Sequence, residues 1–86
     1  MKVAYIKGQA LGAIPNGTRI VKKIYEHKDV HDVGAKGTVL SSVGPTLFEG
    51  KPEYGYFVIW DDRPGLAVFV VGYKIEEEKP LFKERN

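Results

Sequence analysis

The 86-residue sequence contains no cysteine. Disulfide bonds and thiolate metal sites are therefore excluded, and packing has to stabilise the fold without them. The formal net charge is only +2, from 13 basic and 11 acidic residues. This balance does not by itself indicate a polyanionic partner, because nucleic-acid-binding domains usually carry a clustered basic stripe.

Long apolar runs are also missing. Residues 1–9 contain Lys2 and Lys7 but no apolar stretch of the length that a signal peptide or a membrane helix needs. We therefore expect a cytoplasmic protein. A chain of this size forms one domain with a thin core, so we expect its five Tyr, four Phe and single Trp to supply much of the buried area.

What the sequence does contain is a hairpin signal at residues 54–71. Two runs of β-branched and aromatic residues, 54–60 and 66–71, flank five turn-forming residues. Pro64 cannot donate a hydrogen bond to a strand ladder and Gly65 tolerates positive φ. The chain is therefore predicted to reverse direction between these two runs.

Alternation along the first run separates two faces, and only one of them can lie inside. If the inner face is the one with Phe57 and Ile59, the other exposes a row of Tyr and Trp that would be a binding platform. Trp60 is nevertheless expected in the core, because burying an indole of about 200 Å² contributes about 5 kcal/mol as an upper bound. The face opposite Phe57 and Ile59 carries Tyr54, Tyr56, Val58 and Trp60.

Two more strands are expected before the hairpin. In residues 18–25 we expect Ile20 and Ile24 to point inward, with a bulge or an outward-reaching Lys22 stem relieving the conflict on that face. In residues 38–42 we expect a second strand, preceded by a tight turn that brings the backbone close to a neighbouring strand. The two glycines that indicate this turn are Gly34 and Gly37.

The segments on either side of the hairpin are predicted to be less regular. Residues 43–53 contain two prolines and two glycines and are predicted to form a loop, whose length is typical of binding loops. Residues 72–75 are predicted to form a short strand or a single helical turn.

The order of three strand-like segments resembles that of small SH3-like barrels. The segments are Gly-Thr-Arg-Ile-Val at 17–21, Val-Gly-Ala-Lys-Gly-Thr-Val-Leu at 33–40 and Tyr-Phe-Val-Ile-Trp-Asp-Asp at 56–62, followed by Lys-Ile-Glu at 74–76. The resemblance implies an all-β fold, a small SH3-like barrel of about five short antiparallel strands in residues 17–76. An N-terminal segment with an edge strand (1–16) and a C-terminal tail (77–86) complete the chain.

The resemblance implies an architecture and does not select a function. The chain lacks the acidic loop and the Ala-Leu-Tyr-x-Tyr strand of peptide-binding adaptor domains, which argues against recognition of proline-rich peptides.

We expect a non-catalytic binding or structural module. The first hypothesis is a protein–protein interaction through an aromatic groove between the hairpin and residues 43–53, with Tyr54, Tyr56 and Tyr73 as anchors. Residues 1–6 also offer an unpaired strand edge at which a second copy could add to make a homodimer.

Two alternatives belong to other classes of protein. The first strand is basic, and Arg19, Lys22 and Lys23 could bind the phosphates of a nucleic acid. The same residues could equally guard an exposed strand edge. A third hypothesis is an accessory subunit of a larger enzyme.

Neither catalysis nor a metal or cofactor is predicted. Asp61 and Asp62 could be paired carboxylates, but their place before Arg-Pro-Gly is better explained by turn capping. No nucleophile setting or phosphate-binding loop is recognisable. The ligand-type residues His27, Asp29 and His31 would share a face of an extended segment, yet solvated loops commonly contain them, so no metal site is predicted.

Overall fold

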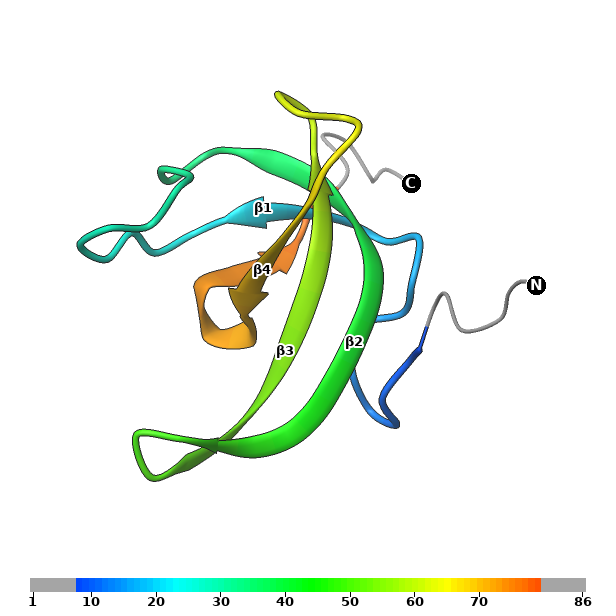
Figure 1. The fold of residues 1–86 in the computed structure, drawn as a ribbon, viewed down its shortest axis with the longest axis vertical. Coiled ribbons are helices and arrows are strands. Elements are labelled where there is room, and N and C mark those ends of the chain that lie inside the picture. The colour runs from blue at the N-terminus through cyan, green and yellow to red at the C-terminus, as the bar shows by residue number, and fades with distance from the viewer. Residues whose placement is uncertain (1–7, 80–86) are drawn as a thin grey trace, which may run out of the picture.

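The computed structural model describes residues 8–79, which form one antiparallel sheet (Figure 1). The strand order is β4-β3-β2-β1-β5. A 3₁₀ turn, η2 (Gly72–Lys74), connects the last two strands, as one of the two forms expected there. The fold is therefore all-β, as predicted. The strands are β1 (Arg19–Lys22), β2 (Lys36–Phe48), β3 (Lys51–Trp60), β4 (Ala67–Val71) and β5 (Ile75–Glu77).

The sheet is strongly curled. β4 and β5 lie at opposite ends of the strand order, yet only the three residues of η2 connect them. In a flat sheet these strands would be about 19 Å apart, at about 4.8 Å per strand, whereas a 3₁₀ turn of this length rises only about 6 Å. The curvature of β2 and β3 in Figure 1 brings the two ends together. Within residues 8–79 β4 and β5 do not pair, so the strand pairing gives an open sheet and not a closed barrel.

The concave side of the sheet holds the hydrophobic core. Trp60 is 1% exposed, which confirms its predicted place in the core. Gly37 lies opposite Trp60 in the register of β2 and β3, and a Cβ on Gly37 would stand 2.8 Å from the Ile59 carbonyl oxygen. The predicted close approach of backbones is therefore present. The buried apolar residues are Ile20, Val39, Tyr56, Val58, Trp60, Val70 and Ile75.

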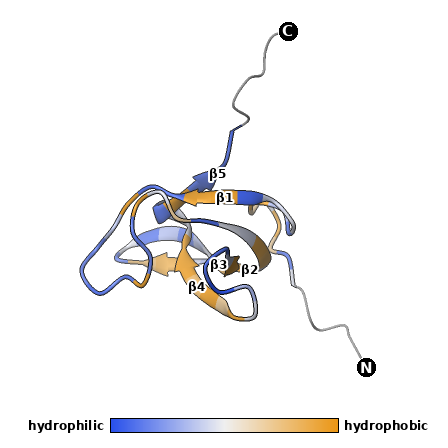
Figure 2. Cartoon of the chain, turned by 90° about the horizontal axis from the view of Figure 1, so that it is seen from above, coloured by the Kyte–Doolittle hydropathy of each residue, from blue (hydrophilic) through white to orange (hydrophobic). Residues whose placement is uncertain are grey.

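The predicted hairpin at residues 54–71 is present as β3 and β4. Its turn is fastened by hydrogen bonds from the Arg63 amide to the Trp60 carbonyl and from the Leu66 amide to the Arg63 carbonyl. Figure 2 shows the apolar character of β4 and β1 in orange.

The first strand is shorter than predicted. Ile20 is buried as expected, but Ile24 lies beyond the end of β1 and is 38% exposed, so its expected inward position is wrong. The amides of Lys23 and Ile24 both donate to the Lys74 carbonyl in η2. The chain leaves the sheet at Lys22 because its next hydrogen bonds go to η2 and not to a neighbouring strand.

The prediction of a loop at residues 43–53 is wrong. β2 runs on to Phe48 and β3 begins at Lys51, so only Glu49 and Gly50 lie between them. Both have positive φ, at 51° and 84°, as the tight turns of two-residue hairpins require. The two prolines are tolerated because the pairing shifts register between Val43 and Thr46, and Pro52 pairs with Leu47 near the hairpin end.

Candidate functional site

A hollow of about 320 Å³ lies where the loop after β1, the end of the β2–β3 hairpin and η2 meet. We call it the Glu-aromatic groove. Its wall has three carboxylates and one lysine, so the groove is acidic. It shares residues 48–53 and Tyr73 with the groove expected from the sequence, but its other wall is the loop after β1 and not the hairpin at residues 54–71. Its lining residues are Glu26, Phe48, Glu49, Lys51, Glu53 and Tyr73.

Two aromatic rings form the apolar part of this groove. The ring centroids of Phe48 and Tyr73 are 5.8 Å apart, with the planes tilted by 40°. The Tyr73 hydroxyl donates a 2.6 Å hydrogen bond to Glu26 Oε1. This bond, with burial and the charge of Glu26, raises the pKa of Tyr73 to about 12. Tyr73 is therefore a neutral donor at physiological pH.

The carboxylates of the groove differ in their surroundings. Hydrogen bonds from Tyr73 and then Lys74 lower the pKa of Glu26, so this carboxylate stays ionised. Lys74 Nζ stands 3.1 Å from Glu26 Oε1. Among residues 8–79, Glu49 and Glu53 have no ion-pair partner. Two of the three negative charges are therefore available to a ligand.

The three tyrosines predicted as anchors have different positions. Tyr73 lines the groove, whereas the half-buried Tyr54 lies outside it and donates its hydroxyl to the Leu11 carbonyl at 2.8 Å. Tyr56 is 3% exposed, and its hydroxyl accepts a 2.9 Å hydrogen bond from the Ile14 amide. Tyr56 is a core residue, so its prediction as a surface anchor is corrected. Phe48 was missed because it lay in a segment that was predicted to be a loop.

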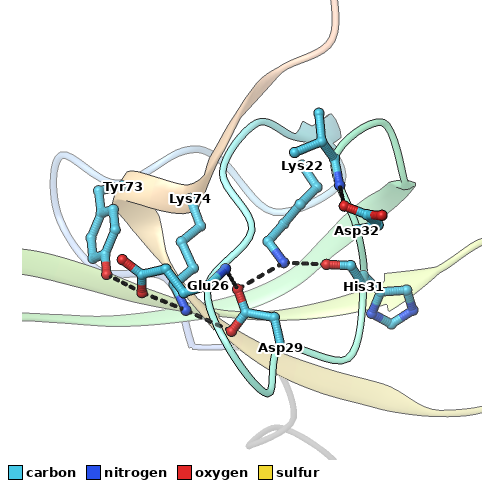
Figure 3. A network of polar contacts seen from close by, with 8 residues as sticks. Lys22, Glu26, Asp29, His31, Asp32, Tyr73 and Lys74 are labelled. Carbon is cyan, nitrogen blue, oxygen red and sulfur yellow. Dashed lines mark hydrogen bonds and ion pairs between the residues drawn. The ribbon is translucent and has the colours of Figure 1, made fainter.

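A buried lysine lies next to the groove. Lys22 was predicted to reach outward, but it is only 3% exposed, so this prediction is wrong. Its ammonium donates to the His31 carbonyl and stands 3.2 Å from Asp29 Oδ2 (Figure 3). Lys74 donates to the other oxygen of Asp29 at 2.7 Å. One carboxylate thus joins a lysine of β1 to a lysine of η2.

Asp29 stays ionised because its pKa is low. Burial alone would raise its pKa, but hydrogen bonds from Lys74, from the Glu26 amide and from Lys22 lower the pKa of Asp29 to about 2. Burial would likewise lower the pKa of Lys74, yet Asp29 and Glu26 together raise it. Both partners therefore stay charged across the physiological range, and the cluster acts as a structural clamp.

Asp61 and Asp62 follow β3 and are adjacent in the sequence, but their carboxylates bind different partners. Asp61 accepts two hydrogen bonds from Arg19, at 2.7 and 2.6 Å. Asp62 Oδ1 lies 2.9 Å from His31 Nε2, and the His31 ring stacks on Trp60 with a 4.4 Å centroid distance. The two carboxylates fasten other segments to the hairpin, so the explanation by turn capping is corrected.

The ligand-type residues His27, Asp29 and His31 do not converge. Asp29 is occupied by two lysines, and His31 packs on Trp60. In the part of the chain that the structure describes, no group of three or more ligand-type side chains could hold a metal ion.

The basic residues of β1 do not form one phosphate-binding surface. Arg19 is paired with Asp61 and stands 3.7 Å from Glu78, and only Lys23 of the three predicted residues is exposed without such a partner among residues 8–79. Lys22 is buried, so its prediction as a phosphate contact is corrected. The edge predicted at residues 1–6 lies outside the described residues.

Two further findings concern the chain as a whole. In residues 8–79 no helical segment has the length and apolar character needed to span a membrane. Comparisons with protein-family models, with curated proteins and with solved structures found no match.

Proposed function

We propose that the chain is a small SH3-like module that binds an extended, basic segment of a partner protein in the Glu-aromatic groove and catalyses no reaction. The resemblance in strand order, the all-β fold and the strong curl of the sheet support the SH3-like assignment. The single observation that carries the function is the acidic, two-ring groove itself.

The chemistry of the groove selects a basic side chain. An arginine or lysine can lay its aliphatic stem on the Phe48 and Tyr73 rings, as long basic side chains do on apolar surfaces. Its charged group would then interact with the ring faces and with Glu49 and Glu53. The groove volume of about 320 Å³ suits one or two such side chains, at the low end of known ligand pockets.

The nucleic-acid alternative has no comparable support. A polyanion would be repelled by the groove, and the basic residues of β1 are mostly occupied by carboxylates. The accessory-subunit hypothesis likewise has no observation in its favour.

The proposal is tested by fluorescence anisotropy with a dye-labelled octapeptide of alternating arginine and valine. We expect the full chain to bind this peptide in the range of about 10–100 μM, and to ignore the same peptide with glutamate in place of arginine. Phe48→Ala and Tyr73→Ala should each weaken binding by about tenfold or more, because each removes an aromatic wall.

Charge provides the matched control. Glu53→Gln removes a carboxylate of the groove and should weaken binding, whereas Glu76→Gln changes an exposed glutamate of β5 and should leave the affinity unchanged. Equal affinity for the arginine and glutamate peptides would refute the proposal. So would tighter binding of a DNA or RNA oligonucleotide that weakens steeply with salt.

A further inference from the structure

β4 lies at one end of the strand order, so only one of its two edges is paired. The Ser42 amide of β2 donates to the Gly8 carbonyl, away from β3. Ser42 is opposite Tyr56, and opposite residues of an antiparallel pair bond either both to each other or both outward. Tyr56 therefore directs its backbone groups toward β4, where Val70 is opposite. The alternate residues of β4 direct theirs to the unpaired edge, and these are Ala67, Phe69 and Val71.

The unpaired edge of β4 carries none of the features that usually block the addition of a strand. Exposed edges commonly contain lysine, proline or a bulge. Residues 67–71 read Ala-Val-Phe-Val-Val, and their register with β3 is unbroken. Within residues 8–79, no backbone hydrogen bond outside the strand ladders involves them. β5, at the other end of the strand order, has only three residues and two of them are glutamates. β4 is therefore the edge that can accept a further strand.

A hollow of about 140 Å³ lies beside this edge. One wall is formed by residues 68–71 of β4 and the other by residues 29–31 of the loop after β1. Lys22, Asp29 and Lys74 also line the hollow, but their charges are paired with one another. The hollow therefore suits an uncharged, aliphatic side chain.

The hollow adjoins the Glu-aromatic groove at η2. Lys74 lines the hollow, and its Nζ lies 2.7 Å from Asp29 Oδ1 and 3.1 Å from Oε1 of Glu26, a residue of the groove. The preceding residue, Tyr73, lines the groove. Figure 3 shows these side chains in one row that runs from Tyr73 to His31. A segment that leaves the groove past η2 therefore meets the unpaired edge of β4.

We propose that the basic segment bound in the Glu-aromatic groove continues as a strand that pairs with β4 and runs antiparallel to it. The proposal rests on the function proposed above and gives the form of the partner. Its basic residues come first, beside η2, and are followed by residues that alternate between aliphatic and polar. The aliphatic side chains enter the hollow.

The polar residues of the partner are the ones whose backbone bonds to β4. They lie opposite Ala67, Phe69 and Val71, and residues that are directly opposite share one side of a sheet. Their side chains therefore lie on the outer side of the sheet, next to the Phe69 ring. That ring packs edge to face on Phe57, with centroids 5.2 Å apart.

A peptide of sequence Arg-Thr-Arg-Thr-Val-Thr-Val-Thr tests the addition of a strand by fluorescence anisotropy with the full chain. Its arginines and valines share one side of an extended chain, so its threonine amides face β4 when the arginines lie in the groove. N-methylation of the sixth residue, a threonine, should weaken binding by about tenfold or more, because it removes a hydrogen bond and places a methyl group against the β4 backbone.

The matched control is N-methylation of the seventh residue, a valine. Its amide points away from β4, so the affinity should change by less than about twofold. A slip of two residues in the register preserves this difference, because backbone direction alternates with a period of two.

Amide hydrogen exchange of the isotope-labelled full chain, followed by NMR, gives a readout on β4 itself. We expect the Phe69 amide to exchange freely without peptide and about tenfold or more slowly at saturation. The Val70 amide, which points to β3, is the internal control and should exchange slowly in both states. A Phe69 amide that is already protected in the free chain would overturn the proposal, because the chain itself or a second copy would then cover the edge.

The two proposals fail in different ways. Equal affinity for this peptide and for its counterpart with glutamate in place of arginine would refute the Glu-aromatic groove, and strand addition with it. Arginine-dependent binding that both N-methyl groups change to the same extent, with fast exchange at Phe69 throughout, would refute strand addition alone.

Discussion

At the scale of single residues, Lys22 shows how polar partners allow a charged side chain to be buried. Its alternation with Ile20 places it on the inner face of β1, where an unpaired ammonium would be costly. The cost is offset by Asp29 and the His31 carbonyl, both supplied by the loop that follows β1. The lysine thereby anchors that loop to the sheet.

Replacing Lys22 should therefore be strongly destabilising. Lys22→Ala leaves buried acceptors unpaired and should lower the free energy of unfolding by about 3 kcal/mol or more. Lys22→Met keeps the apolar stem and should recover part of this loss. The exposed neighbour Lys23 is the control, and Lys23→Ala should change stability by less than about 0.5 kcal/mol. Urea unfolding measures all three, and equal losses for the two alanine variants would contradict the buried pair.

At the scale of elements, the packing of β2 against β3 depends on two glycines in different surroundings. A Cβ on Gly37 would meet Val58 Cγ1 at 2.7 Å, the Ile59 carbonyl oxygen at 2.8 Å and the Trp60 Cα at 3.1 Å, so backbone would have to move. A Cβ on Gly55 would meet only side-chain atoms, chiefly the ring of the half-exposed Phe69. Neither glycine has φ in the left-handed region, so only space distinguishes them.

Alanine at these two positions should therefore have unequal effects. Gly37→Ala should cost about 2–3 kcal/mol, because the strands must separate to admit the methyl group. Gly55→Ala should cost less than about 1 kcal/mol, since the Phe69 ring can turn toward solvent. Thermal and urea unfolding of both variants provide the comparison, and a larger loss at Gly55 would show that the Phe57–Phe69 pair is rigid.

The elements that the sequence predicted well are those with local causes. The β3–β4 hairpin follows from two runs of β-branched and aromatic residues around a turn, and the approach at Gly37 follows from glycine spacing. The segment at 43–53 was misread because its prolines and glycines normally end strands. Here Gly44-Pro45 marks a shift in register and Gly50 a two-residue turn.

The candidate site was less predictable because its causes are distant in the sequence. Tyr73 was expected in a groove, but its neighbours Glu26 and Phe48 come from two other segments. Tyr56 was misassigned because alternation separates two faces without saying which one is covered. The role of Lys22 depends on Asp29 and could not be read from the strand alone.

At the scale of the whole molecule, Asp29 joins β1 to η2, the turn that connects the two edge strands of the sheet. Its carboxylate joins Lys22, at the end of β1, to Lys74, in the turn that leads from β4 to β5. The backbone bonds from Lys23 and Ile24 to the Lys74 carbonyl lie at the same place. The end of β1 and the turn between the two edge strands are therefore held together by charge as well as by backbone hydrogen bonds.

This connection should make stability depend on pH in the acid range. The pKa of Asp29 is lowered from 3.8 to about 2, so the folded state binds this proton less readily than the unfolded chain. The contribution of Asp29 to stability is fully present above pH 3.8, declines as the pH falls below that value, and is lost as the pH falls through about 2.

Asp29→Asn should lower the free energy of unfolding at neutral pH and flatten its decline between these two pH values. Asp61→Asn removes a more exposed ion pair with Arg19, which also lowers the pKa of Asp61, so this variant should flatten the decline less than Asp29→Asn does. Denaturant unfolding at a series of pH values measures these slopes, and an undiminished acid decline in Asp29→Asn would show that other carboxylates cause the loss of stability in acid.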